Sequence, residues 1–176
     1  MIFIPMRPSI NCRSGVTLLE LIMVMVLLFI IAGITVPYLA AGLPDAQIRS
    51  GANQVYAALH IGRNEAATYG FRTRFIVDQE KRTWRLVKEP KPFSEPDEFF
   101  PVGPNWVTTT LPEGVGFSEL EGFVEGEEPE EFLLEFQADG SLSEAARLVL
   151  TNEDGDSRIL EISAATGRVV FVEEEE

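Results

Sequence analysis

The first strong pattern in the chain is an apolar run close to its N-terminus. No charged residue occurs over residues 21–44, and Leu21 to Val36 contains mainly Leu, Ile, Met, Val and Phe. About 20 apolar residues are enough for a helix to cross a bilayer, so the run predicts a membrane-spanning helix. Arg7 and Arg13 precede it without any acidic residue. The positive-inside rule therefore places the N-terminus in the cytoplasm and the residues after about Leu43 on the other side.

Beyond Pro37 and Gly42 the pattern becomes amphipathic. Apolar or small residues recur at intervals of three and four, as on one face of a helix: Ile48, Ala52, Val55, Leu59, Gly62 and Ala66. Gly70 is placed to cap the C-terminus of this helix. We therefore expect one long helix whose first half lies in lipid and whose second half packs on a globular head.

From Phe71 onward the pattern is typical of β-strands. "FRTRFIV" and "TWRLV" flank the turn from Asp78 to Arg82 and predict a hairpin. Further candidate strands are "WVTTTL", "GVGFSEL", "EEFLLEF", "RLVLTN", "RILEIS" and "RVVFVE", with turn signals at Asp139-Gly140, Asp154-Gly155 and Thr166-Gly167. Short strands at this spacing predict an antiparallel, two-layer β head. The expected fold class is α+β, with a long N-terminal helix packed on that head.

A proline-rich segment interrupts the strands. The residues from Lys88 to Trp106 contain five of the eleven prolines, which predicts a loop or insertion rather than core. Phe99, Phe100 and Trp106 are expected to fold back over the head, with an exposed contact patch as the alternative.

The distribution of charge is uneven. The chain has a net charge of -14, which disfavours nucleic-acid binding because phosphate neutralisation needs a basic surface. Arg49 to Lys88 contains eight basic and three acidic residues, whereas Glu89 to Ala146 contains fifteen acidic residues and only Lys91 as a base. Such halves could attract each other between copies or attract partners, although a charge run is more often a solvated face.

Residue types for catalysis or metal binding are scarce. Cys12 is the only cysteine and His60 the only histidine. One histidine cannot supply a set of metal ligands, and a Ser-His-Asp triad would depend wholly on His60, which has no nucleophile elbow beside it in the sequence. Asn152 to Asp156 suggests a calcium loop, but Ser157 and Ser163 occupy the positions where an EF-hand needs Gly and an acid. We expect no enzyme activity, no metal and no cofactor.

Two residues at the start of the apolar run are unusual. Gly15 precedes the run, whereas a secretory signal has its small-residue cleavage site after it. Cleavage after Gly15 would keep the helix on the mature protein and make Val16 the new N-terminus. Glu20 lies inside the run, where a carboxylate near the bilayer centre costs about 2.5–3.5 kcal/mol. It either closes a capping box with Thr17, or pairs with the amino group of Val16 on its own or a neighbouring chain.

The stretch "SGVTLLELIMVMVLLFIIAGITVP" strongly resembles the N-terminal methylation motif of type IV pilins and type II secretion pseudopilins. In those families a prepilin peptidase cuts after the glycine and methylates the new amino terminus. The residues that match in order are Gly15, Val16, Thr17, Leu18, Leu19 and Glu20. Pro37 falls where many members have a helix-kinking proline, and Val16 stands where Phe or Met is usual.

The C-terminal part carries a weaker resemblance, to the H-type minor pseudopilins and their type IV pilus relatives. These share a Phe-x-x-x-Gly turn, a Gly-containing hairpin and a closing Thr-Gly-Arg, matched here by Phe136, Gly140, Gly155, Thr166, Gly167 and Arg168. The resemblances divide the chain into a cleaved leader (1–15), a transmembrane assembly helix (16–43), its amphipathic half (44–70), a periplasmic β domain (71–173, insertion 88–105) and an acidic tail (174–176).

The resemblance implies a minor pseudopilin, a structural subunit of a periplasmic pseudopilus that drives protein export by the type II secretion system. Implied partners are other pseudopilins or pilins, the prepilin peptidase, the inner-membrane assembly platform and lipid. The alternative is a minor type IV pilin for pilus assembly or DNA uptake. DNA receptors of that group use basic residues near the C-terminal strands; Arg168 is present, but Val169 to Glu176 contributes four acids and no base. A third interpretation is an unprocessed, membrane-anchored ligand-binding domain.

Overall fold

The computed structural model describes residues 17–41, 43–103, 108–126 and 128–172, with the backbone alone described over 33–41 and 43–44. The chain divides into two compact units, Met1–Ala41 and Gly42–Glu176. In the first unit, α1 runs from Leu18 to Ala41 and includes Pro37. Among the described residues, no helix combines the length and hydropathy that crossing a membrane requires. α2 runs from Leu43 to Tyr69. The predicted continuity of the two helices falls on Gly42, which lies outside the described residues.

The amphipathic pattern of α2 predicted its buried face correctly. Ile48, Val55 and Leu59 are fully buried, and Gly62 lies so close to β2 that a Cβ there would be 2.8 Å from Leu86 Cδ1. The helix ends as predicted at Gly70, whose φ is 70° and whose N–H donates to the Ala66 carbonyl at 2.9 Å. A positive φ at this position is the usual C-terminal cap, for which glycine is best suited.

The head contains two antiparallel sheets. The first has the strand order β3-β2-β1-β7-β6, with β4 also pairing with β2. Its strands are β1 Thr73–Asp78, β2 Thr83–Lys88, β3 Phe100–Pro101, β4 Thr109–Thr110, β6 Val124–Glu125 and β7 Glu131–Phe136. The second has the order β10-β9-β8-β5, built from β5 Val115–Glu121, β8 Ala146–Asn152, β9 Ser157–Ile162 and β10 Val169–Val172. The predicted α+β head with antiparallel sheets is confirmed.

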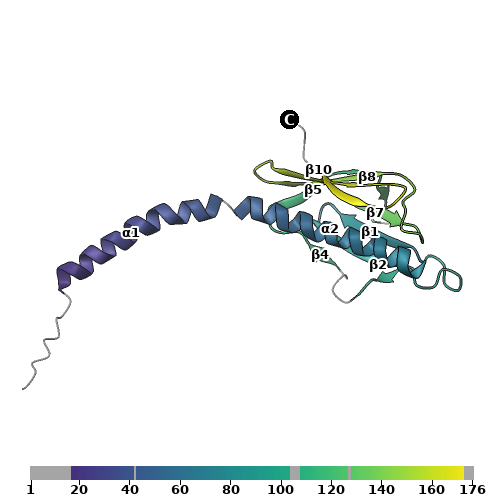
Figure 1. The fold of residues 1–176 in the computed structure, drawn as a ribbon, viewed down its shortest axis with the longest axis horizontal. Coiled ribbons are helices and arrows are strands. Elements are labelled where there is room, and N and C mark those ends of the chain that lie inside the picture. Colours follow the sequence, from purple (N-terminus) through teal and green to yellow (C-terminus); the bar gives the residue numbers. More distant parts are fainter. Residues whose placement is uncertain (1–16, 42, 104–107, 127, 173–176) are drawn as a thin grey trace, which may run out of the picture. The chain divides into compact units, whose positions relative to one another are not determined.

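α2 packs against strands of both sheets (Figure 1). The buried apolar residues form one cluster with contributions from each layer, among them Val55, Leu59, Phe75, Leu86, Phe136, Leu148 and Leu160. On β1, buried and more exposed positions alternate over most of the strand, as expected for a sheet with one face on a core. The helix is thus the common support of the two sheets.

The proline-rich segment contributes more to the head than its composition suggests. Phe100–Pro101 forms the short strand β3, which pairs with β2, and Val102 packs against the core cluster. Glu89, at the start of the segment, is fully buried. A carboxylate can be buried there because Arg72 pairs with it, which composition alone could not reveal.

Candidate functional site

The start of α1 carries the residues on which the sequence-based function depends. Thr17 caps the helix: its Oγ1 accepts the N–H of Glu20 at 3.2 Å, and its carbonyl accepts the N–H of Leu21 at 3.2 Å. The predicted role of Thr17 as N-cap is therefore confirmed. Glu20 lies in the first turn, where a negative charge interacts favourably with the helix dipole.

Gly15 and Val16, where cleavage and methylation are predicted, lie outside the described residues, as does Cys12. Pro37 is described only as part of the α1 backbone. The roles assigned to these residues remain predictions.

α1 presents an apolar surface on all its sides. Each large apolar side chain from Leu18 to Ile31 is between 52% and 79% exposed, and Glu20 is the only charged residue between Leu18 and Ala41. Extended exposed apolar surface marks a site for lipid or for another protein.

In the head, three residues of the second motif, Gly140, Thr166 and Gly167, meet at one place. Gly140 and Gly167 both have positive φ, at 81° and 59°, and a Cβ on Gly167 would overlap the Gly140 carbonyl oxygen. Arg63 of α2 joins them, because its Nε donates to the Thr166 carbonyl at 2.6 Å. The Leu142 N–H donates to the Ala164 carbonyl at 2.8 Å and ties the two turns together.

The remaining motif glycine is elsewhere. Gly155 lies in the turn between β8 and β9, where the Asn152 side chain accepts the Asp156 N–H at 2.8 Å. The register pairs Thr151 with Ser157 at this end of the hairpin and Ala146 with Ile162 at the other. The motif therefore describes two separate turn sites, and neither holds reactive chemistry.

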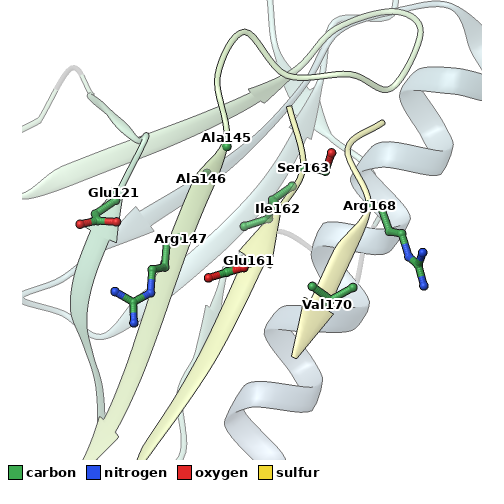
Figure 2. A pocket seen from close by; sticks show the side chains of 9 residues that line it. All are labelled: Glu121, Ala145, Ala146, Arg147, Glu161, Ile162, Ser163, Arg168 and Val170. Carbon is green, nitrogen blue, oxygen red and sulfur yellow. The ribbon is translucent and has the colours of Figure 1, made fainter. Parts of the chain in front are cut away.

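Arg168 lies at the rim of a shallow groove of about 420 Å³ on the outer face of the second sheet (Figure 2). Glu121, Arg147 and Glu161 stand opposite one another across β5, β8 and β9, so charges alternate along the row. Arg147 also lies 3.6 Å from Glu119, measured from Nη1 to Oε2, and the Arg168 side chain points away from the row. The groove presents mixed charge, whereas phosphate binding favours a continuous basic surface.

An ion-pair network that the sequence did not predict holds the proline-rich segment on the first sheet. Arg72 donates to both oxygens of Glu89 at 2.8 Å and to Asp97 Oδ1 at 2.8 Å. Its Nη1 lies 3.5 Å from Glu135 Oε1. The hydrogen bond from Arg72 lowers the pKa of the Glu89 carboxyl, against the effect of burial, and the same bond raises the pKa of Arg72.

Arg74 extends this network to the aromatic residues. Its Nε donates to Glu135 Oε2 at 2.6 Å, and its guanidinium lies 3.8 Å from the centre of the Phe99 ring. Phe99 thus folds back over the head as predicted, whereas Phe100 is 47% exposed and Trp106 lies outside the described residues. The uneven distribution of charge could have indicated this network. Arg72 and Arg74 belong to the basic stretch from Arg49 to Lys88, and their partners belong to the acidic stretch from Glu89 to Ala146.

His60 packs beside Tyr56 on α2, with ring centres 5.2 Å apart. Within the described part of the chain, no group of three or more His, Cys, Asp or Glu side chains could hold a metal ion.

No protein-family model and no curated protein match this chain. Solved structures do. The minor pseudopilin EpsH from the type II secretion system of Vibrio cholerae has a TM-score of 0.56 and 16% sequence identity, covering 76% of this chain and 98% of that one; a second EpsH structure gives 0.55 and 14%, covering 72% and 96%. The type IV minor pilin FimU of Pseudomonas aeruginosa has a TM-score of 0.54 and 16% identity, covering 73% and 90%. At these identities the likeness concerns the fold.

Proposed function

The chain has the fold of the type IV pilin-like pseudopilins, and on that basis we propose that it is a minor pseudopilin, a structural subunit of a periplasmic pseudopilus that serves protein export by type II secretion. The observation that carries the proposal is the apolar surface of α1. Its large side chains are exposed from Leu18 to Ile31, with Glu20 as the single charge. A subunit of this kind would bury that surface first in lipid and then against the helices of other subunits.

The proposed processing gives the carboxylate a partner. Cleavage by a prepilin peptidase after Gly15 would leave Val16 with a methylated amino group only a few residues from Glu20. In a neighbouring subunit that amine is a cation, and in low dielectric a +1/-1 pair offsets part of the cost of burying both charges. Pairing at one position also fixes the register between helices. Glu20 would thus select correctly placed incoming subunits on the assembly platform.

The proposed location is the inner membrane, with a single pass, the N-terminus in the cytoplasm and the head in the periplasm. The uncharged stretch of residues 21–44 and the basic residues Arg7 and Arg13 support this orientation. The role needs no catalytic group. The similar structures are likewise subunits of pseudopili and pili.

A minor type IV pilin is the second candidate, and the comparable likeness to FimU supports it. Its DNA-uptake form has less support, because the groove beside Arg168 alternates acidic and basic side chains. Salt-sensitive retention of DNA on a filter by the purified chain in detergent would favour that form, and no retention above a detergent blank would oppose it.

Intact mass of the protein recovered from membranes tests the proposal directly. We expect loss of residues 1–15 together with the addition of one methyl group. A Gly15→Val variant should keep the leader, because it replaces the glycine after which the peptidase of the resembling families cuts. A wild-type protein that retains Met1 and works without cleavage would support the third interpretation, a membrane-anchored ligand-binding domain.

A further inference from the structure

The proline-rich segment displays one aromatic side chain entirely to solvent. Phe93 is fully exposed, yet the turn around it is well defined. The N–H groups of Ser94 and Glu95 both donate to the Lys91 carbonyl, at 3.3 and 3.0 Å. Lys91 Nζ also lies 2.8 Å from Glu95 Oε2 and forms an ion pair across the turn. An ordered piece of backbone therefore holds an apolar ring in water, away from the described residues of its own chain.

Both ends of this turn are fastened to the first sheet. Arg72 donates to Glu89 at one end and to Asp97 at the other, with all three hydrogen bonds at 2.8 Å. Three prolines between these ends restrict the backbone further, because each ring fixes φ: Pro90, Pro92 and Pro96. Single exposed apolar residues are ordinary on protein surfaces, but a rigid loop loses little entropy when it binds. Residues 90–98, the Phe93 loop, are thus preorganised for a contact.

The composition of the Phe93 loop indicates what it can contact. Aromatic residues are enriched in the buried centre of protein interfaces, and complementary charges set the orientation of the partners. The loop carries three acidic residues and one basic residue: Glu95, Asp97, Glu98 and Lys91. A fitting partner surface is therefore an apolar recess with positive charge at its edge.

A recess of this kind lies elsewhere on the same head, between α2 and the edge strand β10. This α2–β10 groove has a volume of about 380 Å³ and is lined by Arg49, Ala52, Asn53, Arg158, Phe171 and Val172. Pockets of about 300–1,000 Å³ hold drug-sized ligands, so the groove has room for one aromatic ring. Phe171 stacks on Tyr56 with ring centres 5.0 Å apart. It is still 45% exposed, so part of its surface is open to a second aromatic partner.

The α2–β10 groove carries more positive than negative charge. Arg49 Nε lies 3.2 Å from Asp45 Oδ1, and Arg158 Nη2 lies 3.3 Å from the same oxygen. A guanidinium has five N–H donors, so two guanidiniums that share one carboxylate oxygen keep donors for a further acceptor. Their side chains are 63% and 37% exposed, which leaves them accessible. The groove therefore complements the Phe93 loop in charge as well as in polarity.

We propose that the Phe93 loop of one copy docks in the α2–β10 groove of a second copy. The Phe93 ring packs on the exposed part of Phe171, and the acidic residues of the loop face Arg49 and Arg158. The occupant comes from another chain, because each loop is fastened to its own first sheet through Arg72 and keeps its Phe93 exposed there.

This contact joins two different patches, so each copy offers its loop to one neighbour and its groove to another. Repetition of such a heterologous contact produces a ring or an open helical filament. The inference rests on the proposed function, to which it adds a contact between the heads of neighbouring subunits. Leader cleavage and export play no part in the contact, so the two proposals can be tested separately.

Cross-linking between two versions of the full chain in detergent micelles tests the contact. Both versions carry Cys12→Ser and each has its own affinity tag. One carries Ser94→Cys beside Phe93, the other carries Asn53→Cys in the groove, and a short bismaleimide joins the two thiols by addition. We expect the product with both tags to be at least about fivefold more abundant than with Asp154→Cys in place of Ser94→Cys. Asp154 is the control because it is exposed in the turn between β8 and β9.

Variants of the two surfaces identify the groups that make the contact. Phe93→Ala should lower the cross-linked fraction at least about fivefold, because it removes the central aromatic residue. Arg49→Glu should lower it by a similar factor, because it reverses a charge at the edge of the groove. Arg82→Glu makes the same change of charge outside the groove and should leave the fraction unchanged. All these positions are exposed, so the substitutions leave the core intact.

Three results would overturn the proposal. The first is an equal yield for Ser94→Cys and Asp154→Cys, the second is an unchanged yield in Phe93→Ala, and the third is an equal yield in Arg49→Glu and Arg82→Glu. Protein from membranes that has lost residues 1–15 while the purified chain gives no specific cross-link would remove this contact and leave the proposed function standing.

Discussion

Gly167 lies directly against the carbonyl oxygen of Gly140, with no room for a side chain between the two turns. Both residues have positive φ, and Arg63 of α2 closes the contact through its bond to the Thr166 carbonyl at 2.6 Å. Steric space and backbone conformation therefore both demand glycine at position 167. The contact joins the end of β7, the turn before β10 and the helix.

Gly167→Ala should destabilise the head by about 2 kcal/mol or more, because it adds overlap to the strain of a positive φ. Gly155→Ala is the matched control: Gly155 has φ 90°, but a Cβ there meets nothing within 4 Å. Its cost should stay near 1 kcal/mol. Urea denaturation followed by tryptophan fluorescence measures both. Equal losses of stability in the two variants would mean that the contact with Gly140 adds nothing to the cost of placing alanine at a positive φ.

Glu89→Gln should destabilise the head by about 2–3 kcal/mol, because it removes the charge from a fully buried, doubly hydrogen-bonded partner of Arg72. Asp97→Asn changes another carboxylate bonded to the same arginine, but its side chain is 72% exposed. We expect it to cost less than about 1 kcal/mol. Urea denaturation at neutral pH measures the stability of both variants. A larger loss of stability for Asp97→Asn than for Glu89→Gln would contradict this prediction.

The same pair predicts how stability depends on pH. The pKa of Glu89 is lower in the folded chain than its ordinary value, first because of the hydrogen bond from Arg72. Its contribution is therefore fully present above the unfolded pKa of about 4.3 and is lost as the pH falls through the folded pKa.

Wild type should thus lose more stability than Glu89→Gln between about pH 7 and about pH 3, measured by urea denaturation. Asp78, whose pKa is lowered by the hydrogen bond from Lys81, keeps a residual acid dependence in both proteins. Parallel pH curves for wild type and the variant would show that Glu89 does not titrate in this way.

Glu20→Ala and Glu20→Gln should insert into the membrane and be cleaved, yet enter filaments more than about tenfold less often, since each removes one member of the proposed ion pair with the Val16 amine. Thr17→Ala is the control, because it removes the cap, worth about 1 kcal/mol, but keeps the carboxylate. Immunoblots of sheared filaments against membrane fractions give the ratio. Normal incorporation of Glu20→Ala would remove the pairing argument, and a defect in Thr17→Ala alone would assign the effect to the cap.

Local patterns predicted much of this fold. The three- and four-residue spacing identified the buried face of α2, and the predicted hairpin is present in β1 and β2. The glycines after Asp139, Asp154 and Thr166 have positive φ as turn glycines should. Each of these features depends on neighbours within a few residues, which is the range that a sequence pattern describes.

The arrangement of the strands was beyond that range. β1 lies between β2 and the distant β7, and nothing local to Thr73 or Phe136 specifies that pairing. The two-residue strands β3 and β6 are too short to show alternation. Burial of Glu89 depends on Arg72 across the strand pair, so a segment rich in proline and acid could not be recognised as part of the head. At the N-terminal site the cap could be predicted, because Thr17 and Glu20 are one helical turn apart.

The position of α2 between the two sheets has a mechanical consequence. Strands of both sheets pack on this one helix, so a push or pull along its axis reaches the two sheets at the same time, as shear. A load carried by α2 is therefore shared between the two sheets.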